Sequence, residues 1–180
     1  AVKVSSSYNK RYKYNGNIYF DQENITNLRT YILCQKGIAR TFQLPLVFPT
    51  MTVYDNIKIG ANFGNVGKKE SEKNEFVDKI INLVGLKNKL NTLANNLRLF
   101  DKKMTMLAAV LATGPKLLLL DEPAGGLNES EIAQSTDIFK RINSEFKITV
   151  IIIEHLMKVL VGICQSMMVL ENGKQLCFGL

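Results

Sequence analysis

Two short apolar runs in the second half of the chain each end abruptly in polar side chains. Residues 116–122 read KLLLLDE, in which four consecutive leucines precede Asp121 and Glu122. Residues 147–155 read KITVIIIEH, which is apolar and β-branched up to a glutamate and His155. Short runs without polar alternation are typical of strands buried on both faces of a parallel sheet. We therefore predict two central strands that place polar side chains where they end.

The segment between these runs, residues 129–146, is amphipathic and predicts a helix. A helix that joins two parallel strands brings both strand ends to the same edge of the sheet, where open parallel sheets bind ligands. Two acids at such a point suit phosphoryl chemistry, because Asp121 can hold Mg²⁺ through water while Glu122 polarises an attacking water. The alternatives are a solvated acidic turn after the strand and a packed or surface role for His155, the single histidine of the chain.

The first half of the chain has shorter apolar stretches and one long helical region. We expect strands at residues 18–20 and 39–43, a helix at residues 27–36, and helices from residue 53 to residue 111. Apolar residues at a spacing of four, followed by a glycine, predict one buried helix face and its end. These residues are Phe76, Ile80, Val84 and Gly85.

A hairpin is predicted near the end of the chain. Asn172 and Gly173 form a favoured two-residue turn between the apolar stretches 167–170 and 175–178. Together with the upstream strands and helices, this pattern predicts an α/β sheet with a helical insertion.

Composition favours a single domain whose cysteines are reduced thiols. A length of 180 residues suits one domain, and no apolar run is long enough to span a bilayer. Residues 1–17 are polar and basic, unlike a signal peptide, and three scattered cysteines lack metal-ligand spacing.

The net charge of +7 comes from dispersed lysines without interleaved aromatic residues. We therefore expect no direct nucleic-acid partner, and a basic face that is solvated or lies near anionic lipid headgroups.

A glutamine adds a third candidate position to the two strand ends. Gln43 closes the stretch IARTFQ and precedes two prolines, which places it at the start of a loop. Taken in order, four features of the chain resemble the nucleotide-binding domain of ATP-binding cassette (ABC) transporters, over roughly residues 15–179. They are Gln43, the Asp121 and Glu122 pair, the loop at residues 126–128, and His155. The stretches GIARTFQ, LVFPTMTVYDNI and IIIEHLMKVL are most similar to the ATP-binding subunit of branched-chain amino acid importers.

The resemblance implies a single, partial nucleotide-binding domain over residues 1–180, with a P-loop NTPase-like α/β core. Residues 50–112, approximately, would form the helical subdomain, with residues 1–49 and 113–180 as parts of the core. The implied function is ATP hydrolysis coupled to import of branched-chain or other amino acids, with ATP and Mg²⁺ as cofactors. The implied partners are a second ABC ATPase subunit, identical or different, and a membrane permease that contacts residues 44–50. The implied location is the cytoplasmic face of the plasma membrane.

The resemblance also implies a role for each site residue. Gln43 would contact Mg²⁺ and the attacking water, and Asp121 would bind Mg²⁺. Glu122 would be the general base, and His155 would contact the γ-phosphate. Asn128 ends the loop that would contact nucleotide, at a position where the family often has aspartate.

Residues 97–103, LRLFDKK, stand where the family has the signature L-S-x-G-x-x-R/K. Lys103 fits the pattern, whereas Arg98 replaces the serine and Phe100 replaces the glycine. An arginine binds phosphate well, but a phenylalanine opposes the close backbone approach that glycine permits. A phosphate contact by Arg98 and a plain helix start both remain open. Two other functions stay open with them: a degenerate, non-hydrolytic regulatory subunit, and a soluble ABC-type ATPase that acts on nucleic acid or ribosomes.

The phosphate-binding pattern G-x-x-x-x-G-K-[ST] does not occur in the 180 residues. The nearest stretch is residues 64–69, GNVGKK, where the spacing differs and Lys69 stands in place of Ser or Thr. We predict that this stretch is a solvated loop that leads into a helix. The simplest interpretation is that the sequence begins after the phosphate loop, as a fragment, a split gene or a partial reading frame. We therefore expect weak or no ATP binding by this chain alone.

Overall fold

The structure is a computed structural model that describes residues 16–64 and 69–179. These residues fall into two compact units. One unit runs from Arg29 to Ile163, and the other combines the described residues up to Leu28 with those from Cys164 onward. Among the described helices, none is both long and apolar enough to cross a membrane.

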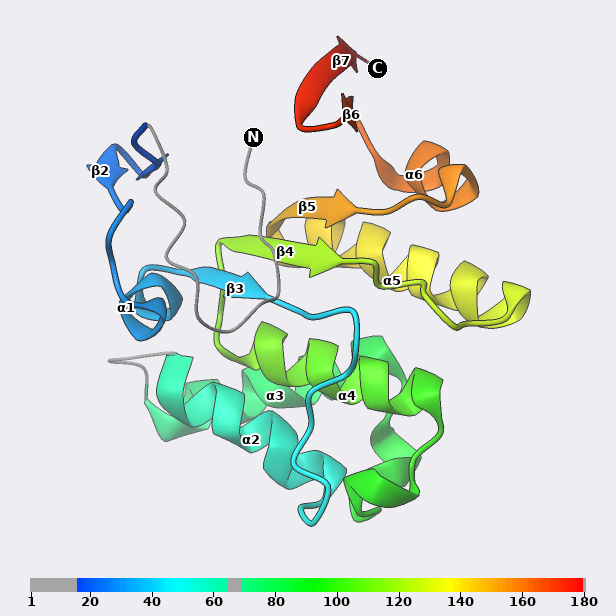
Figure 1. The fold of residues 1–180 in the computed structure, drawn as a ribbon. Coiled ribbons are helices and arrows are strands. Elements are labelled where there is room, and N and C mark those ends of the chain that lie inside the picture. Colours follow the sequence, from blue (N-terminus) through cyan, green and yellow to red (C-terminus); the bar gives the residue numbers. More distant parts are fainter. Residues whose placement is uncertain (1–15, 65–68, 180) are drawn as a thin grey trace. The chain divides into compact units, whose positions relative to one another are not determined.

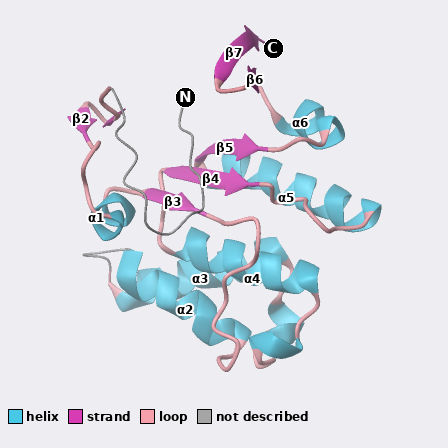
Figure 2. Ribbon diagram, in the orientation of Figure 1, coloured by secondary structure: helices cyan, strands magenta, loops and turns pink. Residues whose placement is uncertain are grey.

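The larger unit is built on three parallel strands in the order β3-β4-β5. The strands are β3 (Ile38–Arg40), β4 (Leu117–Asp121) and β5 (Thr149–Ile153). Figure 2 shows their arrowheads pointing the same way, so all three carboxyl ends lie at one edge of the sheet. The predicted parallel pairing of the two apolar runs is confirmed, because Asp121 lies opposite Ile153 at the last position of the ladder.

Helix α5 (Glu129–Phe146) makes the crossover from β4 to β5, over the residues predicted from the sequence. The Asn128 side chain accepts a hydrogen bond from the Glu131 backbone N–H, and the Glu131 side chain accepts one from the Asn128 N–H. This capping box satisfies two of the donors that a helix start leaves without partners. The apolar face of α5 packs in the core through Ile138, Phe139 and Ile142.

Three helices form the insertion between β3 and β4: α2 (Val53–Gly64), α3 (Glu70–Val84) and α4 (Leu99–Ala112). Helices α2 and α4 approach closely at Gly60, which has no side chain. A Cβ atom at this position would lie 1.9 Å from the Ala109 carbonyl oxygen. Figure 1 shows α4 and α5 along one face of the sheet. That face of β4 is closed by Leu118 and Leu120, which are buried.

The predicted end of α3 is confirmed. Gly85 follows the helix in a left-handed conformation, with φ of 71°, and its N–H donates to the Ile81 carbonyl. A left-handed residue is the common way to end a helix, and glycine adopts it without strain. Two single-turn helices, Lys87–Lys89 and Ala94–Asn96, lead from α3 to α4.

Strand β5 differs from its prediction as a central strand. Among the described residues it pairs only with β4, which makes it an edge of the three-stranded sheet. Its side chains alternate in burial: Val150 and Ile152 pack against the core on one face, whereas Ile151 and Ile153 on the other face are exposed. The apolar run thus predicted the strand correctly, whereas the expected burial on both faces is not found among the described residues. Short helices flank the sheet, α1 (Thr30–Gln35) before β3 and α6 (Met157–Ile163) after β5.

The smaller unit contains two antiparallel strand pairs. The strands are β1 (Tyr19–Phe20), β2 (Glu23–Asn24), β6 (Met167–Glu171) and β7 (Lys174–Gly179). The predicted hairpin is confirmed, because β6 and β7 are joined by Asn172 and Gly173 with φ of 48° and 78°. Two consecutive positive φ values are the geometry that matches the twist of a two-residue hairpin.

Candidate functional site

The candidate site lies at the carboxyl edge of the three-stranded sheet. Gln43 follows β3, Glu122 follows β4 directly, and His155 follows β5 by one residue. The Glu122 N–H donates to the Ile153 carbonyl oxygen at 2.8 Å, which continues the sheet by one bond past the last paired residues. The sequence prediction that the acids and the histidine share one edge of one sheet is confirmed by this pairing.

Gln43 and Glu122 are in direct contact. The Gln43 Nε2 donates to Glu122 Oε2 at 2.6 Å, across 79 residues of sequence. Glu122 has a positive φ of 43°, a backbone conformation that non-glycine residues seldom adopt. Such strain persists where the surrounding structure imposes it, and it is frequent at functional sites. The arrangement holds a carboxylate and a carboxamide together beside the strand ends.

Asp121 is paired with a residue that the sequence did not single out. The Arg40 Nη2 lies 2.6 Å from Asp121 Oδ2, and both side chains are less than one-third exposed. Arg40 lies opposite Leu119 in the ladder, and Asp121 comes two residues later on the same face of β4. The guanidinium also lies 5.1 Å from the centre of the Phe42 ring. The negative charge of Asp121 is therefore balanced by the guanidinium of Arg40 from the neighbouring strand.

Glu154 ties the ends of β4 and β5 together. Its side chain is 0% exposed. One carboxylate oxygen accepts from the Ala124 N–H at 2.9 Å, and the other accepts from the His155 and Leu156 N–H groups at 3.0 and 3.3 Å. A buried carboxylate satisfied by backbone donors fixes the loops on which neighbouring residues stand. Its position directly after an apolar run is the sequence signal that could have marked it.

His155 is open to solvent at this edge, with its side chain 68% exposed. Its Nδ1 lies 3.7 Å from the nearer oxygen of Glu154. In the part of the chain that the structure describes, His155 makes no hydrogen bond or ion pair to Gln43 or Glu122. The structure therefore places the imidazole on the same edge as the Gln43–Glu122 pair but does not join them directly.

Asn128 and Arg98, also expected to contact nucleotide, lie at helix starts. The Asn128 Oδ1 is engaged in the cap of α5, where it accepts from the Ser130 hydroxyl at 2.7 Å as well as from a backbone N–H. Arg98 precedes α4 with its side chain 78% exposed, and its Nε lies 3.7 Å from Asp101. The structure does not bring either side chain to Glu122.

The start of α4 also shows where Phe100 points. Its side chain is 7% exposed and belongs to the hydrophobic core. The Phe100 ring, which was expected to oppose a close backbone approach, therefore points into the core and helps to pack α4. Of the two alternatives left open for residues 97–103, the structure shows a helix start, with α4 beginning at Leu99. Residues 65–68, the middle of the expected solvated loop GNVGKK, lie outside the described residues.

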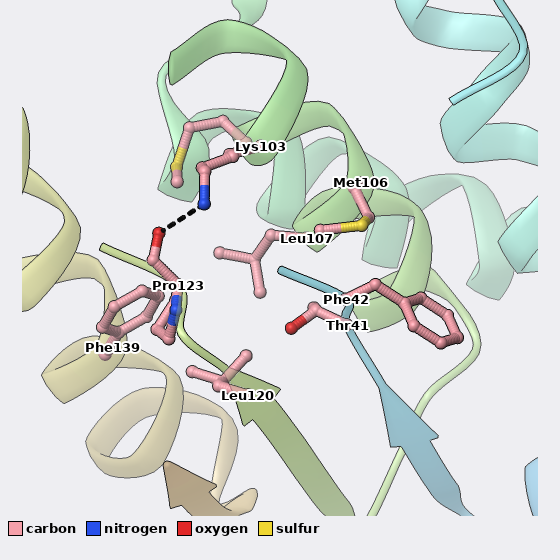
Figure 3. Close-up of a pocket in the computed structure, with 9 residues that line it drawn as sticks. Thr41, Phe42, Lys103, Met106, Leu107, Leu120, Pro123 and Phe139 are labelled. Carbon is pink, nitrogen blue, oxygen red and sulfur yellow. Dashed lines mark hydrogen bonds between the residues drawn. The ribbon is translucent and has the colours of Figure 1, made fainter. Parts of the chain in front are cut away.

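Lys103 fits the basic position of the signature pattern, but the sequence did not assign it a role. The residue is 5% exposed, and its Nζ donates to the carbonyl oxygens of Gln43, Glu122 and Pro123 at 3.1, 3.4 and 3.2 Å. Burial lowers the pKa of the Lys103 ammonium, while the negative charges of Glu154 and Glu122 act in the opposite direction. Figure 3 shows its contact with Pro123 beside a small pocket lined by residues of β4, α4 and α5 and by Thr41 and Phe42, which follow β3. The buried Thr41 hydroxyl faces that pocket without a described hydrogen-bond partner.

The donor set at this edge fits Mg²⁺. Asp121 offers a carboxylate, and Gln43 offers a carboxamide oxygen because its nitrogen is engaged with Glu122. Mg²⁺ prefers oxygen ligands and usually binds one or two protein groups together with substrate phosphates and water. The described residues contain no group of three or more His, Cys, Asp or Glu side chains that could hold a metal ion.

Residues 5–125 match the family model described as ABC transporter. The chain is 32% identical over 161 residues to the methionine import ATP-binding protein MetN 1 of Bacillus thuringiensis, which covers 88% of the chain and 47% of that protein. It is 30% identical over 177 residues to the high-affinity branched-chain amino acid transport ATP-binding protein BraF of Pseudomonas aeruginosa, covering 91% and 69%. The chain thus spans about half the length of the methionine import proteins that it matches.

Solved structures agree with these matches. A nucleotide-free ATP-binding cassette from an ABC transporter has a TM-score of 0.74 and 29% identity, over 92% of the chain and 69% of that structure. The cbiO1 protein of Clostridium perfringens, part of the ABC transporter complex cbiONQ, has a TM-score of 0.80 and 28% identity, over 92% and 66%. The predicted P-loop NTPase-like core with a helical insertion is therefore confirmed, and the chain belongs to the ABC transporter family.

Proposed function

We propose that the natural gene product containing this chain is the ATP-binding and ATP-hydrolysing subunit of an amino acid importer. The observation that carries the proposal is the 2.6 Å contact between Gln43 and Glu122 at the carboxyl edge of the sheet, with Asp121 and His155 at the adjacent strand ends. Relatives named for methionine and branched-chain amino acid transport support an amino acid as the cargo. A branched-chain amino acid is the substrate we favour.

In this proposal Glu122 is the general base that takes a proton from the water attacking the γ-phosphate. Gln43 orients that water and holds the Glu122 carboxylate through its side-chain N–H. Mg²⁺, when bound, neutralises charge on the phosphates, and Asp121 with the Gln43 carboxamide oxygen would hold it. The exposed His155 imidazole is accessible to a terminal phosphate, which it would contact with a ring N–H.

The site would be completed by a second ABC ATPase subunit, identical or different. Arg98 is exposed at the start of α4, where a guanidinium can bind a phosphate held by the opposite subunit. The loop that ends in Asn128 would contact the same nucleotide. In this arrangement residues 50–112 form the helical subdomain, and residues 1–49 and 113–180 belong to the α/β core.

The loop after Gln43 would contact the permease and so place the subunit at the cytoplasmic face of the membrane. Leu44, Leu46 and Phe48 are 75%, 64% and 56% exposed, whereas Val47 between them packs against the core. Exposed apolar side chains close together mark a surface that another protein covers. The same loop begins at Gln43, so a shift of the permease would reach the hydrolytic residues directly.

Two measurements on the natural gene product test this proposal. A fluorescent ATP analogue should bind saturably in the presence of Mg²⁺, and ATP should be hydrolysed. A tagged protein should co-purify a polytopic permease from membranes, and the double substitution L46E/F48E should abolish that capture while leaving ATP binding unchanged. Phe63→Glu is the matched control, because Phe63 is 74% exposed on α2 and lies outside the loop. Equal capture by the wild type and L46E/F48E would contradict the proposed docking loop.

A non-hydrolytic regulatory subunit is the second candidate, favoured by the start of α4. Arg98 and Phe100 replace the small residues of the family pattern, and Phe100 is built into the core. A protein that dimerises with nucleotide but shows no turnover in the presence of its permease would support this candidate over the first.

A further inference from the structure

Lys103 joins three segments that are distant in sequence. It projects from α4 and reaches the carbonyl oxygen of Gln43 after β3 and those of Glu122 and Pro123 after β4. A lysine ammonium has three N–H donors and no acceptor, so three carbonyl oxygens match its donor number. One side chain therefore holds the backbone of both members of the Gln43–Glu122 pair.

The partners of Lys103 set it apart from an ordinary buried ion pair. In the described residues its ammonium makes no salt bridge to a carboxylate, although the residue is only 5% exposed. A buried cation is costly unless it is fully hydrogen-bonded, and an apolar side chain of similar size would fill the same space without that cost. Its three contacts also lie in one place, because all three carbonyls belong to Gln43, to Glu122 or to the residue that follows Glu122.

We propose that Lys103 is a positioning residue that holds the Gln43 loop against the Glu122 turn and so sets the contact between the two side chains. This inference rests on the proposed function. Glu154 braces the same turn from β5 through the Ala124 N–H, so the turn after β4 is held from both sides. Without the ammonium, the backbone of the Gln43 loop is no longer joined to the turn through Lys103. The 2.6 Å hydrogen bond between the Gln43 and Glu122 side chains would then have to hold the loop and the turn together by itself.

A measurement on the unaltered protein tests the geometry first. In NMR spectra at low temperature, the Lys103 ammonium protons should be protected from exchange and should show through-hydrogen-bond couplings to the carbonyl carbons of Gln43 and Pro123. An ammonium in free exchange with solvent would overturn the proposal. This measurement does not require any variant to fold or any nucleotide to bind.

Substitutions then test the consequence. Lys103→Met removes the ammonium and keeps most of the stem, and Lys103→Arg keeps a cation with several donors. The Gln43 side-chain amide resonances should move toward those of an exposed glutamine in Lys103→Met and remain closer to wild type in Lys103→Arg. The matched control is Lys102→Met, the neighbouring half-buried lysine of α4. A Gln43 amide signal that is the same in wild type and Lys103→Met would overturn the proposal.

Turnover separates positioning from a purely structural role. In the natural gene product, Lys103→Met should lower kcat by about 10-fold or more with little change in ATP affinity, because a small misplacement of catalytic groups acts mainly on the transition state. Lys103→Arg should recover part of the loss. If Glu122→Gln lowers turnover and Lys103→Met does not, this inference fails while the proposed function stands. If Glu122→Gln also leaves turnover unchanged, the proposed function itself fails.

Discussion

Gln43 and Glu122 lie 79 residues apart in sequence, and their side chains are joined by a hydrogen bond of 2.6 Å. The contact exists because β3 and β4 are parallel neighbours whose carboxyl ends meet at one edge. It pairs an N–H donor with a carboxylate, a combination that is stronger than a hydrogen bond between neutral groups. The carboxylate that we propose as general base therefore has a fixed neighbour on the loop that we propose for permease contact.

Gln43→Ala should slow ATP hydrolysis more than it weakens ATP binding. Loss of a hydrogen bond to a charged group corresponds to about 1.5 to 3 kcal/mol, or roughly a 10- to 100-fold change in rate if the bond acts in the transition state. Steady-state hydrolysis and nucleotide titration of the natural gene product would measure the two effects separately. A variant that lost affinity and kept kcat would show that Gln43 serves binding instead.

The Arg40–Asp121 pair should contribute to the stability of the fold. Both side chains are mostly buried, so removing one partner leaves the other charge poorly compensated. A double-mutant cycle with Arg40→Met and Asp121→Asn, followed by urea unfolding, should give a coupling free energy of about 1 to 2 kcal/mol.

The exposed pair Arg141–Glu145 on α5 offers the control for this cycle. Its side chains are 41% and 49% exposed, and the residues are four apart on one helix. Its coupling free energy should not exceed about 0.5 kcal/mol. Equal coupling in the two cycles would contradict the importance given to the Arg40–Asp121 pair.

The backbone at Glu122 should be strained in a way that a glycine would relieve. Its positive φ of 43° is strained for any residue with a Cβ atom and is relaxed for glycine. Glu122→Gly should therefore be more stable than Glu122→Ala by about 1 kcal/mol in urea unfolding, although both lack the carboxylate. The comparison removes the loss of the Gln43 contact from the difference, because both variants lose it. An alanine variant at least as stable as the glycine variant would show that the backbone is not strained there.

Local sequence patterns predicted those parts of the fold that depend on local interactions. Helix α5 was predicted over its full length because its apolar face repeats along the helix and a strand precedes it. The hairpin at Asn172 and Gly173 was predicted because the turn needs two residues that tolerate positive φ. The shared sheet edge was predicted because a parallel crossover brings both strand ends to one side.

The partners of the site residues could not be predicted in the same way. The pairing of Arg40 with Asp121 spans 81 residues and depends on the register of two strands. Lys103 fits a basic position of a family pattern, and nothing in that pattern shows that its ammonium turns inward to three carbonyls. The exposed face of β5 was missed because an apolar run does not show whether other elements cover both faces of the strand.

The most direct test of the account is the effect of Glu122→Gln on the natural gene product. The amide keeps the size of the side chain and removes its basicity, so ATP binding should be retained while turnover falls by about 100-fold or more. Nucleotide titration and single-turnover hydrolysis, measured on the same preparation, would give both values. Unchanged hydrolysis would contradict the role of Glu122, and with it the claim that this sheet edge carries the chemistry.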